Sequence, residues 1–326
     1  MVERLTIYET SSVLPQHNLA IEKYLFDSVA EGELILYLWQ NENTVVCGRN
    51  QNVYKECHIT KLIDNGGRLV RRLSGGGAVY HDLGNLNFTF LARDGVYSLE
   101  KQLSVITEAC VSLGVPAELT GRNDILAGGR KFSGNAFYSS KGTRYHHGTL
   151  MVKVDFSHLS DYLNVDRAKL QAKGVDSVRS RVANLTEFSD RVTIPSLKAA
   201  LEDSLGKVYG LVPQRLTLDE SRAEVAEYEK LFSSDDWIYG RKMSFNNEFG
   251  KRFVWGDFVF RAEVAGGIIK DAVIFSDALD AEMILTLAER FKGAKYLASE
   301  LCAAVAEVCK DAQQREDITE LIKDSI

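Results

Sequence analysis

Apolar residues recur at helical spacing in several parts of the chain. In residues 18–29 the apolar side chains fall on one side and Gly32 follows, which predicts an amphipathic helix. Ser98 stands at the N-cap position of a second such stretch, which Gly114 closes. Three further helices are expected, over residues 195–205, 281–291 and 298–311.

Strands are predicted where β-branched and aromatic residues lie between turn residues. Residues 86–90 alternate between apolar and polar side chains, which is typical of a half-buried strand. Gly128-Gly129 and Lys141-Gly142 suit two-residue hairpin turns. The other strand candidates are residues 34–39, 44–47, 68–72, 78–80, 149–154, 253–264 and 267–275.

The patterning changes near residue 240, which indicates two domains. Residues 212–236 are polar, acidic and poor in apolar periodicity, so a linker or a bridging helix is expected there. After Arg241, two predicted antiparallel strands and two amphipathic helices form a small α+β domain. A length of 326 residues also suits two domains.

Composition excludes several classes of protein. The formal net charge of -6 argues against a nucleic-acid partner, which would need a basic face. Residues 1–10 show no apolar signal segment, and the longest apolar runs, such as residues 34–39, are too short to span a membrane. The five cysteines form no CxxC pair and are interpreted as reduced thiols of a cytoplasmic protein.

The densest chemical signal is the segment RRLSGGGAVYHD, residues 71–82. Three consecutive glycines let the backbone come close to a ligand, and their N–H groups can bind an anion. Two adjacent arginines can hold a carboxylate or a phosphate. A flexible β-turn is the alternative for the glycines alone. Neither a P-loop nor a GxGxxG motif that opens a helix is present.

Three more clusters follow along the chain. Lys131 comes just after the Gly128-Gly129 turn and could stabilise a carboxylate and a phosphate together, while Asp124 could hold Mg²⁺. The alternative for this lysine is a solvent-facing side chain. His146 and His147 are adjacent on a strand and should point to opposite faces, which disfavours a shared zinc site. Residues 173–181 could be a loop that closes over a phosphate, or a plain basic surface loop.

Cations crowd into this glycine-rich part of an otherwise acidic chain. The pattern predicts a local cationic site for a small anionic ligand. The residues concerned are Arg68, Arg71, Arg72, Arg122, Arg130, Lys131 and Arg144.

Taken in order, these clusters resemble bacterial lipoate–protein ligase A. The matching segments, within residues 20–190, are RRLSGGGAVYHDLGN, GRNDI, RKFSGNAF, HHGTLM and KGVDSVRSRVANLTE. A later stretch, from FVWGDFVFRAEV to GGIIKDAVIFSDAL, resembles the accessory domain of the same family. The resemblance implies an α+β fold with mixed β-sheets flanked by helices, shared with biotin–protein ligases. Residues 1–240 are then the catalytic domain and residues 241–326 the accessory domain.

The resemblance also implies an activity. Lipoate and MgATP give lipoyl-AMP and pyrophosphate, and the ε-amine of an acceptor lysine then attacks this mixed anhydride. The implied acceptors are lipoyl domains of the E2 subunits of 2-oxo-acid dehydrogenases and the glycine-cleavage H protein. ATP and Mg²⁺ are the expected cofactors, and a cytoplasmic monomer without nucleic-acid or membrane partners is expected.

Site residues follow from the resemblance position by position. Lys131 is expected to bridge the lipoyl carbonyl and the phosphate. The residues implied to contact ATP or the adenylate are Arg72, Gly77, Ala78, Val79, Tyr80, Lys131, His147, Gly148 and Thr149. Those implied to contact lipoate are Arg72, Gly75, Gly76, Lys131, Ser133, Gly134 and Ala136, and Asp124 is the candidate Mg²⁺ ligand.

Two alternative functions stay open. One is a lipoyl- or octanoyl-transferase of the same fold; the known chemistry of that class needs a cysteine nucleophile, so here it would have to work without one. No cysteine lies between residues 110 and 302, and Cys110 falls on an apolar helix face, which favours a role in the core. The other alternative is a non-catalytic protein that binds lipoyl domains.

Overall fold

The structure is a computed structural model that describes residues 1–120, 124–164, 182–241 and 243–326. Two sequence-based expectations, the loop of residues 173–181 and the contribution of residues 121–123 to the second cluster, lie outside the described residues.

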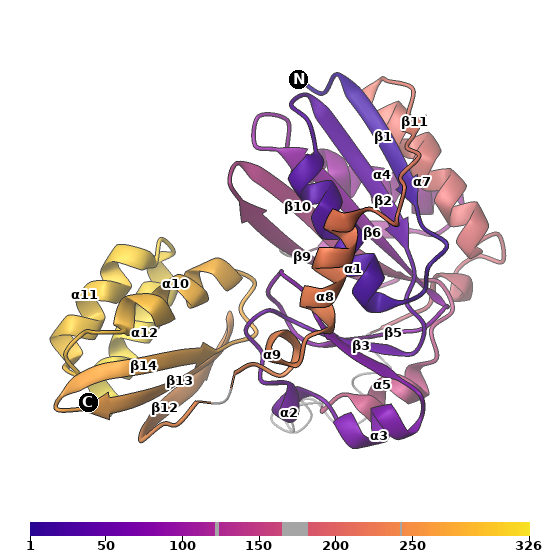
Figure 1. The fold of residues 1–326 in the computed structure, drawn as a ribbon. Coiled ribbons are helices and arrows are strands. Elements are labelled where there is room, and N and C mark those ends of the chain that lie inside the picture. The colour runs from indigo at the N-terminus through magenta and orange to yellow at the C-terminus, as the bar shows by residue number, and fades with distance from the viewer. Residues whose placement is uncertain (121–123, 165–181, 242) are drawn as a thin grey trace.

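An eight-stranded mixed sheet forms the centre of the N-terminal part of the chain (Figure 1). The strand order is β11-β1-β2-β6-β10-β9-β8-β7; β1 is parallel to both of its neighbours, and the other pairs are antiparallel. The strands are β1 (Arg4–Glu9), β2 (Glu33–Trp39), β6 (Asn85–Arg93), β7 (Ala117–Thr120), β8 (Asp124–Ala127), β9 (Arg130–Ser140), β10 (Thr143–Met151) and β11 (Gln214–Arg215).

Helices cover both faces of this sheet, which confirms the expected fold class. Helices α4 (Leu99–Ser112) and α7 (Ile194–Tyr209) share one hydrophobic core with the sheet. Helices α1 (Pro15–Ser28) and α8 (Ala223–Ser233) form a second core on the opposite face. Among the described residues, no helix has both the length and the apolar character needed to cross a bilayer.

The expectation of a half-buried strand over residues 86–90 is wrong. Strand β6 lies in the middle of the sheet, and Asn87 and Thr89 are as deeply buried as their apolar neighbours. The apolar positions face α4 and α7, and the polar positions face the side that α1 covers. The polar side chains persist there because they are hydrogen-bonded, Thr89 to Glu22 and Asn87 to Asn85.

A smaller sheet carries the glycine segment. Its order is β4-β3-β5, and strand β3 (Thr44–Cys47) pairs in parallel with β4 (Arg68–Arg71) and antiparallel with β5 (Val79–His81). The glycines connect β4 to β5. Short helices surround this sheet: α2 (Val53–Glu56), α3 (Ile59–Asp64), α5 (Phe156–Tyr162) and α9 (Asp235–Ile238). The 3-10 turn η2 (Leu185–Glu187) packs instead into the core of the large sheet.

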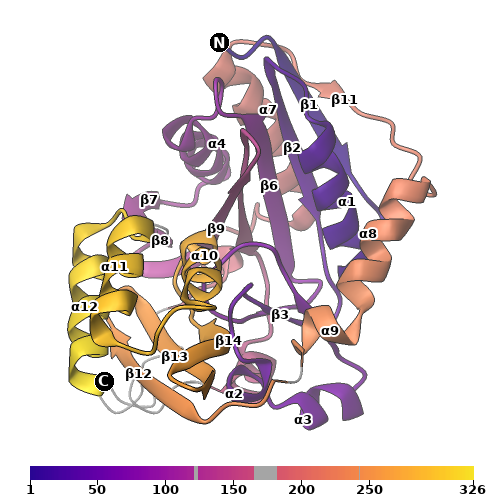
Figure 2. The same cartoon turned by 60° about the vertical axis from the view of Figure 1, so that its left-hand side comes forward.

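Residues 247–325, called here the C-terminal unit, have their own core (Figure 2). A three-stranded antiparallel sheet packs against three helices. The elements are β12 (Asn247–Phe253), β13 (Gly256–Ala265), β14 (Ile268–Phe275), α10 (Ala281–Phe291), α11 (Ala298–Val308) and α12 (Ala312–Ser325).

The antiparallel strand pair expected over residues 253–264 and 267–275 is confirmed as β13 and β14, although β13 begins three residues later than expected. Two other elements of this unit were missed. Strand β12, which turns into β13 at Val254 and Trp255, is mostly exposed and polar. The third helix, α12, has few apolar residues and was missed for that reason. Both elements contribute only a few side chains to the core, so their periodic signal is weak.

Other local expectations are confirmed. Ser98 caps α4 by accepting a hydrogen bond from the Lys101 N–H. The hairpin turns at residues 128–129 and 141–142 have positive φ angles, as type I′ turns require. The predicted strand over residues 149–154 is displaced, since β10 ends at Met151.

Candidate active site

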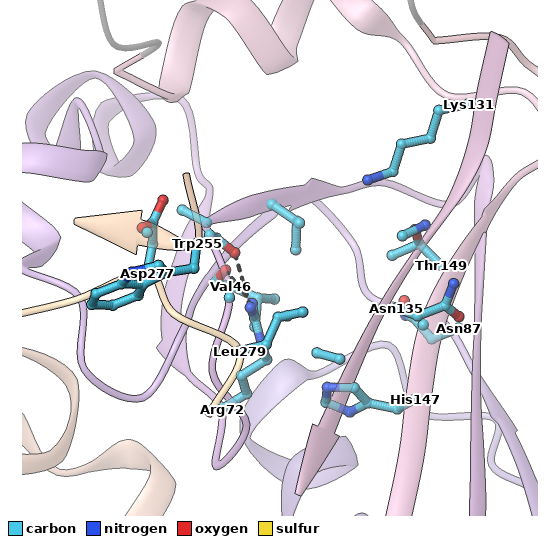
Figure 3. A pocket seen from close by; sticks show the side chains of 18 of the residues that line it. Val46, Arg72, Asn87, Lys131, Asn135, His147, Thr149, Trp255, Asp277 and Leu279 are labelled. Atoms are coloured by element: carbon cyan, nitrogen blue, oxygen red, sulfur yellow. Dashed lines mark hydrogen bonds between the residues drawn. The ribbon is translucent and has the colours of Figure 1, made fainter. Parts of the chain in front are cut away.

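A cavity of about 750 Å³ lies where the large sheet, the glycine segment and the C-terminal unit meet. Figure 3 shows Lys131 and Thr149 on one side of this cavity and Trp255 and Asp277 on the other. The cavity is therefore lined by two parts of the chain that fold around separate cores.

Arg72 fixes the glycine turn, defined here as residues Ser74–Ala78. Its guanidinium donates hydrogen bonds to the carbonyl oxygens of Val46 (3.1 Å), Gly75 (2.6 Å) and Gly77 (2.9 Å). A further bond runs from Nε to Ser74 Oγ (2.9 Å). The side chain lines the cavity but is almost completely buried, and these partners account for most of its donors. Arg72 thus shapes the turn in this structure.

The three glycines face different surroundings. Gly76 has a φ of 87°, which a residue with a side chain rarely adopts, and its N–H donates to Ala278 O of the C-terminal unit (3.0 Å). A Cβ atom on Gly75 would lie 2.3 Å from Ala278 O. A Cβ atom on Gly77 would meet nothing within 4 Å. Gly77 therefore borders open space, whereas Gly75 packs against the C-terminal unit.

Lys131 enters the cavity from β9, directly after the hairpin turn (Figure 3). Its side chain crosses Gly134, where an added Cβ would lie 3.2 Å from Nζ. Gly148 on β10 is similarly restricted, because a Cβ there would lie 2.6 Å from Gly134 O and 2.7 Å from the Phe88 ring. The small residues around Lys131 thus leave room for an extended lysine and allow the strands to pack closely.

His146 and His147 point to opposite faces of β10, as expected. His146 lies between Gln102 and Asn135, and burial lowers its pKa to about 3. His147 lies on the cavity side, between Glu22 and Ser74. The two imidazoles belong to different hydrogen-bond networks, so they do not form one ligand pair.

Comparison with known proteins identifies this arrangement. The lipoyl protein ligase A/B catalytic domain matches residues 14–206, and the bacterial lipoate protein ligase C-terminus matches residues 242–323. A lipoate-protein ligase A from Bdellovibrio bacteriovorus is 38% identical over 303 residues, which cover 90% of this chain and 89% of that protein. The chain belongs to the lipoate–protein ligase family.

Two solved structures support this assignment for the ligase. The structure of Plasmodium falciparum LipL1 in complex with lipoate has a TM-score of 0.85 and 28% identity, and the match covers 98% of this chain and 99% of that one. A lipoate-protein ligase A bound with ATP has a TM-score of 0.63 and 28% identity, and the match covers 74% of this chain and 99% of that one.

Most of the sequence-predicted site residues of the ligase meet at the cavity. They are Arg72, Gly76, Gly77, Ala78, Val79, Lys131, Gly134, Ala136, His147, Gly148 and Thr149. Three others do not line it. Ser133 is fully buried on β9, Tyr80 packs beside Tyr162, and Gly75 faces the C-terminal unit. Asp124 pairs with Gly134 through its backbone, and its side chain lies outside the described residues.

The expected cationic cluster is not one site. Arg68, Arg130 and Arg144 form ion pairs with Glu42, Glu187 and Asp94 away from the cavity. Arg71 is buried and donates to backbone carbonyl oxygens, including those of Gly48 and Ile238. Among the described members of the set, only Arg72 and Lys131 line the cavity. A count of charges in a sequence does not show which of them are neutralised by partners.

Several lining residues of the ligase were missed by the sequence reasoning. His81 lines the cavity; burial, followed by the charge of Arg72, lowers its pKa to about 3, so its ring is neutral. Six more come from β2, β6 and the C-terminal unit: Trp39, Asn87, Arg252, Trp255, Asp277 and Leu279. Trp255, Asp277 and Leu279 stand in the stretch that resembles the accessory domain, but that resemblance did not assign them to the cavity. Their signal is spatial, since they converge only in the folded chain.

Proposed function

We propose that this ligase activates lipoate with ATP and transfers the lipoyl group to a lysine of an acceptor protein. In the first step a carboxylate oxygen of lipoate attacks the α-phosphorus of ATP and pyrophosphate leaves. In the second step the acceptor amine attacks the carbonyl carbon of lipoyl-AMP, and AMP leaves. The observation that carries this proposal is Lys131, the lysine that reaches into the cavity opposite the glycine turn.

The first step brings two anions together, so their repulsion must be reduced. Lys131 is proposed to contact the lipoyl carbonyl and the α-phosphate, where a fixed cation stabilises the developing charge. The backbone of Gly77, Ala78, Val79 and Tyr80 and the region of His147, Gly148 and Thr149 are proposed to hold ATP. Arg72, Gly75, Gly76, Ser133, Gly134 and Ala136 are proposed to surround lipoate.

Mg²⁺ is proposed as a cofactor, with Asp124 as its ligand. The backbone register places Asp124 opposite Gly134, which lines the cavity. A carboxylate together with substrate phosphates is the usual way in which proteins hold this ion. The ion would screen the phosphate charges.

Acceptor proteins are proposed to be lipoyl domains of E2 subunits and the H protein. A related structure comes from a structural analysis of a bi-partite lipoate protein ligase and its E2 lipoyl domain from Thermoplasma acidophilum. The acceptor amine must be neutral to attack, and a free lysine has a pKa of about 10.4. Residues 1–240 are proposed as the catalytic domain and residues 241–326 as the accessory domain. A cytoplasmic location is proposed because the five cysteines are unpaired. A monomer is proposed because residues of one chain line the cavity.

A thiol-dependent transferase is disfavoured by the cysteines themselves. None of the five lines the cavity. Burial raises the pKa of Cys47 and of Cys110 to about 12, so neither forms a thiolate readily at neutral pH.

Lipoate-dependent exchange of labelled pyrophosphate into ATP tests the proposal. The intact protein should catalyse exchange only when lipoate is present. Lys131→Ala should lower the exchange rate by about 10²–10³-fold, whereas Lys153→Ala, an exposed lysine outside the cavity, should match the wild type. No exchange by the intact protein would refute the activation step and favour a transferase or a non-catalytic binder.

A further inference from the structure

A buried carboxylate lies behind the glycine turn. Glu22, on α1, has 1% of its surface exposed, and its Oε1 atom accepts two hydrogen bonds. One comes from Thr89 Oγ1 on β6 (2.7 Å), and the other joins Oε1 to His147 Nδ1 on β10 (2.8 Å). A carboxylate this deeply buried is stable only when its partners are fixed.

The partners of Glu22 extend in two directions. Trp39 Nε1 donates to Thr89 Oγ1 (3.1 Å), which links a lining residue of the cavity to the same carboxylate. On the other side, His147 Nε2 lies 2.7 Å from Ser74 Oγ, and Ser74 Oγ accepts from Arg72 Nε (2.9 Å). A continuous chain of hydrogen bonds therefore joins Arg72 to Glu22 through Ser74 and His147.

Only one assignment of protons satisfies this chain with a neutral imidazole. Arg72 has only donors and an ionised Glu22 has only acceptors. The Ser74 hydroxyl, which accepts from Arg72, then donates to His147 Nε2. His147 must therefore carry its proton on Nδ1 and donate it to Glu22. Both ring nitrogens are occupied by protein partners, so neither remains for the nucleotide.

An arginine and a glutamate stand at the two ends of this chain of hydrogen bonds. Arg72 and Glu22 are both buried and are connected through hydrogen bonds to Ser74 and His147. Arg72 in turn holds the carbonyl oxygens of Gly75 and Gly77. The orientation of the guanidinium, and with it the shape of the glycine turn, therefore depends on a carboxylate on a different element of the fold.

We propose that Glu22, His147 and Ser74 are positioning residues that hold Arg72, and through it the glycine turn, in the geometry that binds ATP. Serine is not a nucleophile here, because Ser74 is fully buried and does not line the cavity. This inference rests on the proposed ATP-dependent activation. It changes the role expected for His147, from a contact with the nucleotide to an action through Ser74.

The test compares buried carboxylates with and without a connection to the turn. Glu22→Gln and Ser74→Ala are made singly and together, and Thr89→Val serves as a milder variant that keeps the charge. Glu33→Gln is the matched control, because Glu33 is also a buried carboxylate that accepts from a threonine, Thr6 (2.6 Å), far from the glycine turn. Lipoate-dependent pyrophosphate exchange gives kcat and the KM for ATP for each variant, and thermal unfolding gives stability.

Glu22→Gln and Ser74→Ala should each lower kcat/KM for ATP by about 10–100-fold, mainly through KM, since a displacement of about 1 Å in a binding site can cost 10²-fold. The kcat/KM of the double variant should be no lower than that of the less active single variant, because both substitutions break the same chain of hydrogen bonds. Thr89→Val should show a smaller change in the same parameter. Glu33→Gln should lower stability and leave kcat/KM within about twofold of the wild type.

Two results would overturn the proposal: Glu22→Gln behaves like Glu33→Gln, or the effects of Glu22→Gln and Ser74→Ala multiply in the double variant. Hydrogen exchange at the amides of residues 74–79 gives a readout that does not need activity. Exchange there should rise in Glu22→Gln and Ser74→Ala and not in Glu33→Gln. If the wild type shows no pyrophosphate exchange, the proposed function fails, and the amide exchange still decides whether the chain holds the turn.

Discussion

Gly75→Ala tests how tightly the C-terminal unit is docked on the glycine turn. The new Cβ would lie 2.3 Å from Ala278 O and 2.7 Å from Leu279 O, and both atoms belong to the backbone of the C-terminal unit. Backbone oxygens cannot rotate away as a flexible side chain would. To reach an ordinary separation, the Ala278 carbonyl would have to move by about 1 Å. Gly77→Ala is the matched control, because its Cβ would meet nothing within 4 Å.

The structure sets the size of the expected effect. Overpacking a close contact costs roughly 1–3 kcal/mol. The backbone hydrogen bonds across this interface include Gly76 N–H to Ala278 O (3.0 Å) and Ser276 N–H to Asn50 O (3.0 Å), each worth about 1 kcal/mol. The clash is therefore as large as one or more of these bonds. It should raise the open population by about 5–150-fold, since each 1.4 kcal/mol is a factor of ten.

Hydrogen exchange of the Ser276 amide measures this opening directly, because that N–H donates across the interface. Its exchange rate follows the population of the open state when closing is fast. Gly75→Ala should speed exchange at Ser276 by the factor given above, while Gly77→Ala should leave it unchanged. Equal rates in the two variants would show that residue 75 does not hold the C-terminal unit. A rise in the KM for lipoate without faster exchange would instead support Gly75 as part of the lipoate site.

Three further outcomes are expected. Burial lowers the pKa of His17, but hydrogen bonds and charges from Glu229 and Glu220 outweigh this effect and raise the pKa. Protonated His17 should therefore stabilise the fold by roughly 0.5–1 kcal/mol below pH 6.5. Thermal unfolding should show the wild type to be more stable than His17→Gln at low pH, and this difference should disappear as the pH rises through the raised pKa. Arg71→Lys should lower the free energy of unfolding by roughly 1–3 kcal/mol, seen as a lower urea midpoint with an unchanged m value, because lysine cannot reach all the carbonyl oxygens that the guanidinium holds. Iodoacetamide near neutral pH should label only the half-buried Cys302 and leave pyrophosphate exchange intact, and a loss of exchange would return a thiol to the mechanism.

Elements with strong local signals could be predicted from the sequence. Helix α10 spans residues 281–291 as expected, because its apolar side chains lie on one face and Asp280 caps it. The turn at residues 128–129 was predictable because two glycines supply the positive φ angles that the hairpin needs. In both cases the information lies within a few residues.

Elements that depend on distant partners could not be predicted in the same way. The polar positions of β6 indicate a solvent-facing side, but α1 and Glu22 cover that side and satisfy Thr89. Strand β12 has an exposed, charged face, and its place at the edge of a sheet follows from pairing with β13. A pattern along one segment does not show which other segment will cover it.

The active site repeats this division. The glycine turn and Lys131 could be found because their motifs are short and ordered along the chain. Ser74 stood inside such a motif, yet nothing local showed its role, since its partner His147 lies 73 residues after it. Glu22, the carboxylate that binds this histidine, lies 125 residues before His147. The wall that the C-terminal unit supplies is equally remote, and the resemblance of this unit to the accessory domain did not mark Trp255 or Leu279 as lining residues. Motifs therefore identify many of the groups that line the cavity, whereas the groups that hold them in place are recognised only from contacts in the folded chain.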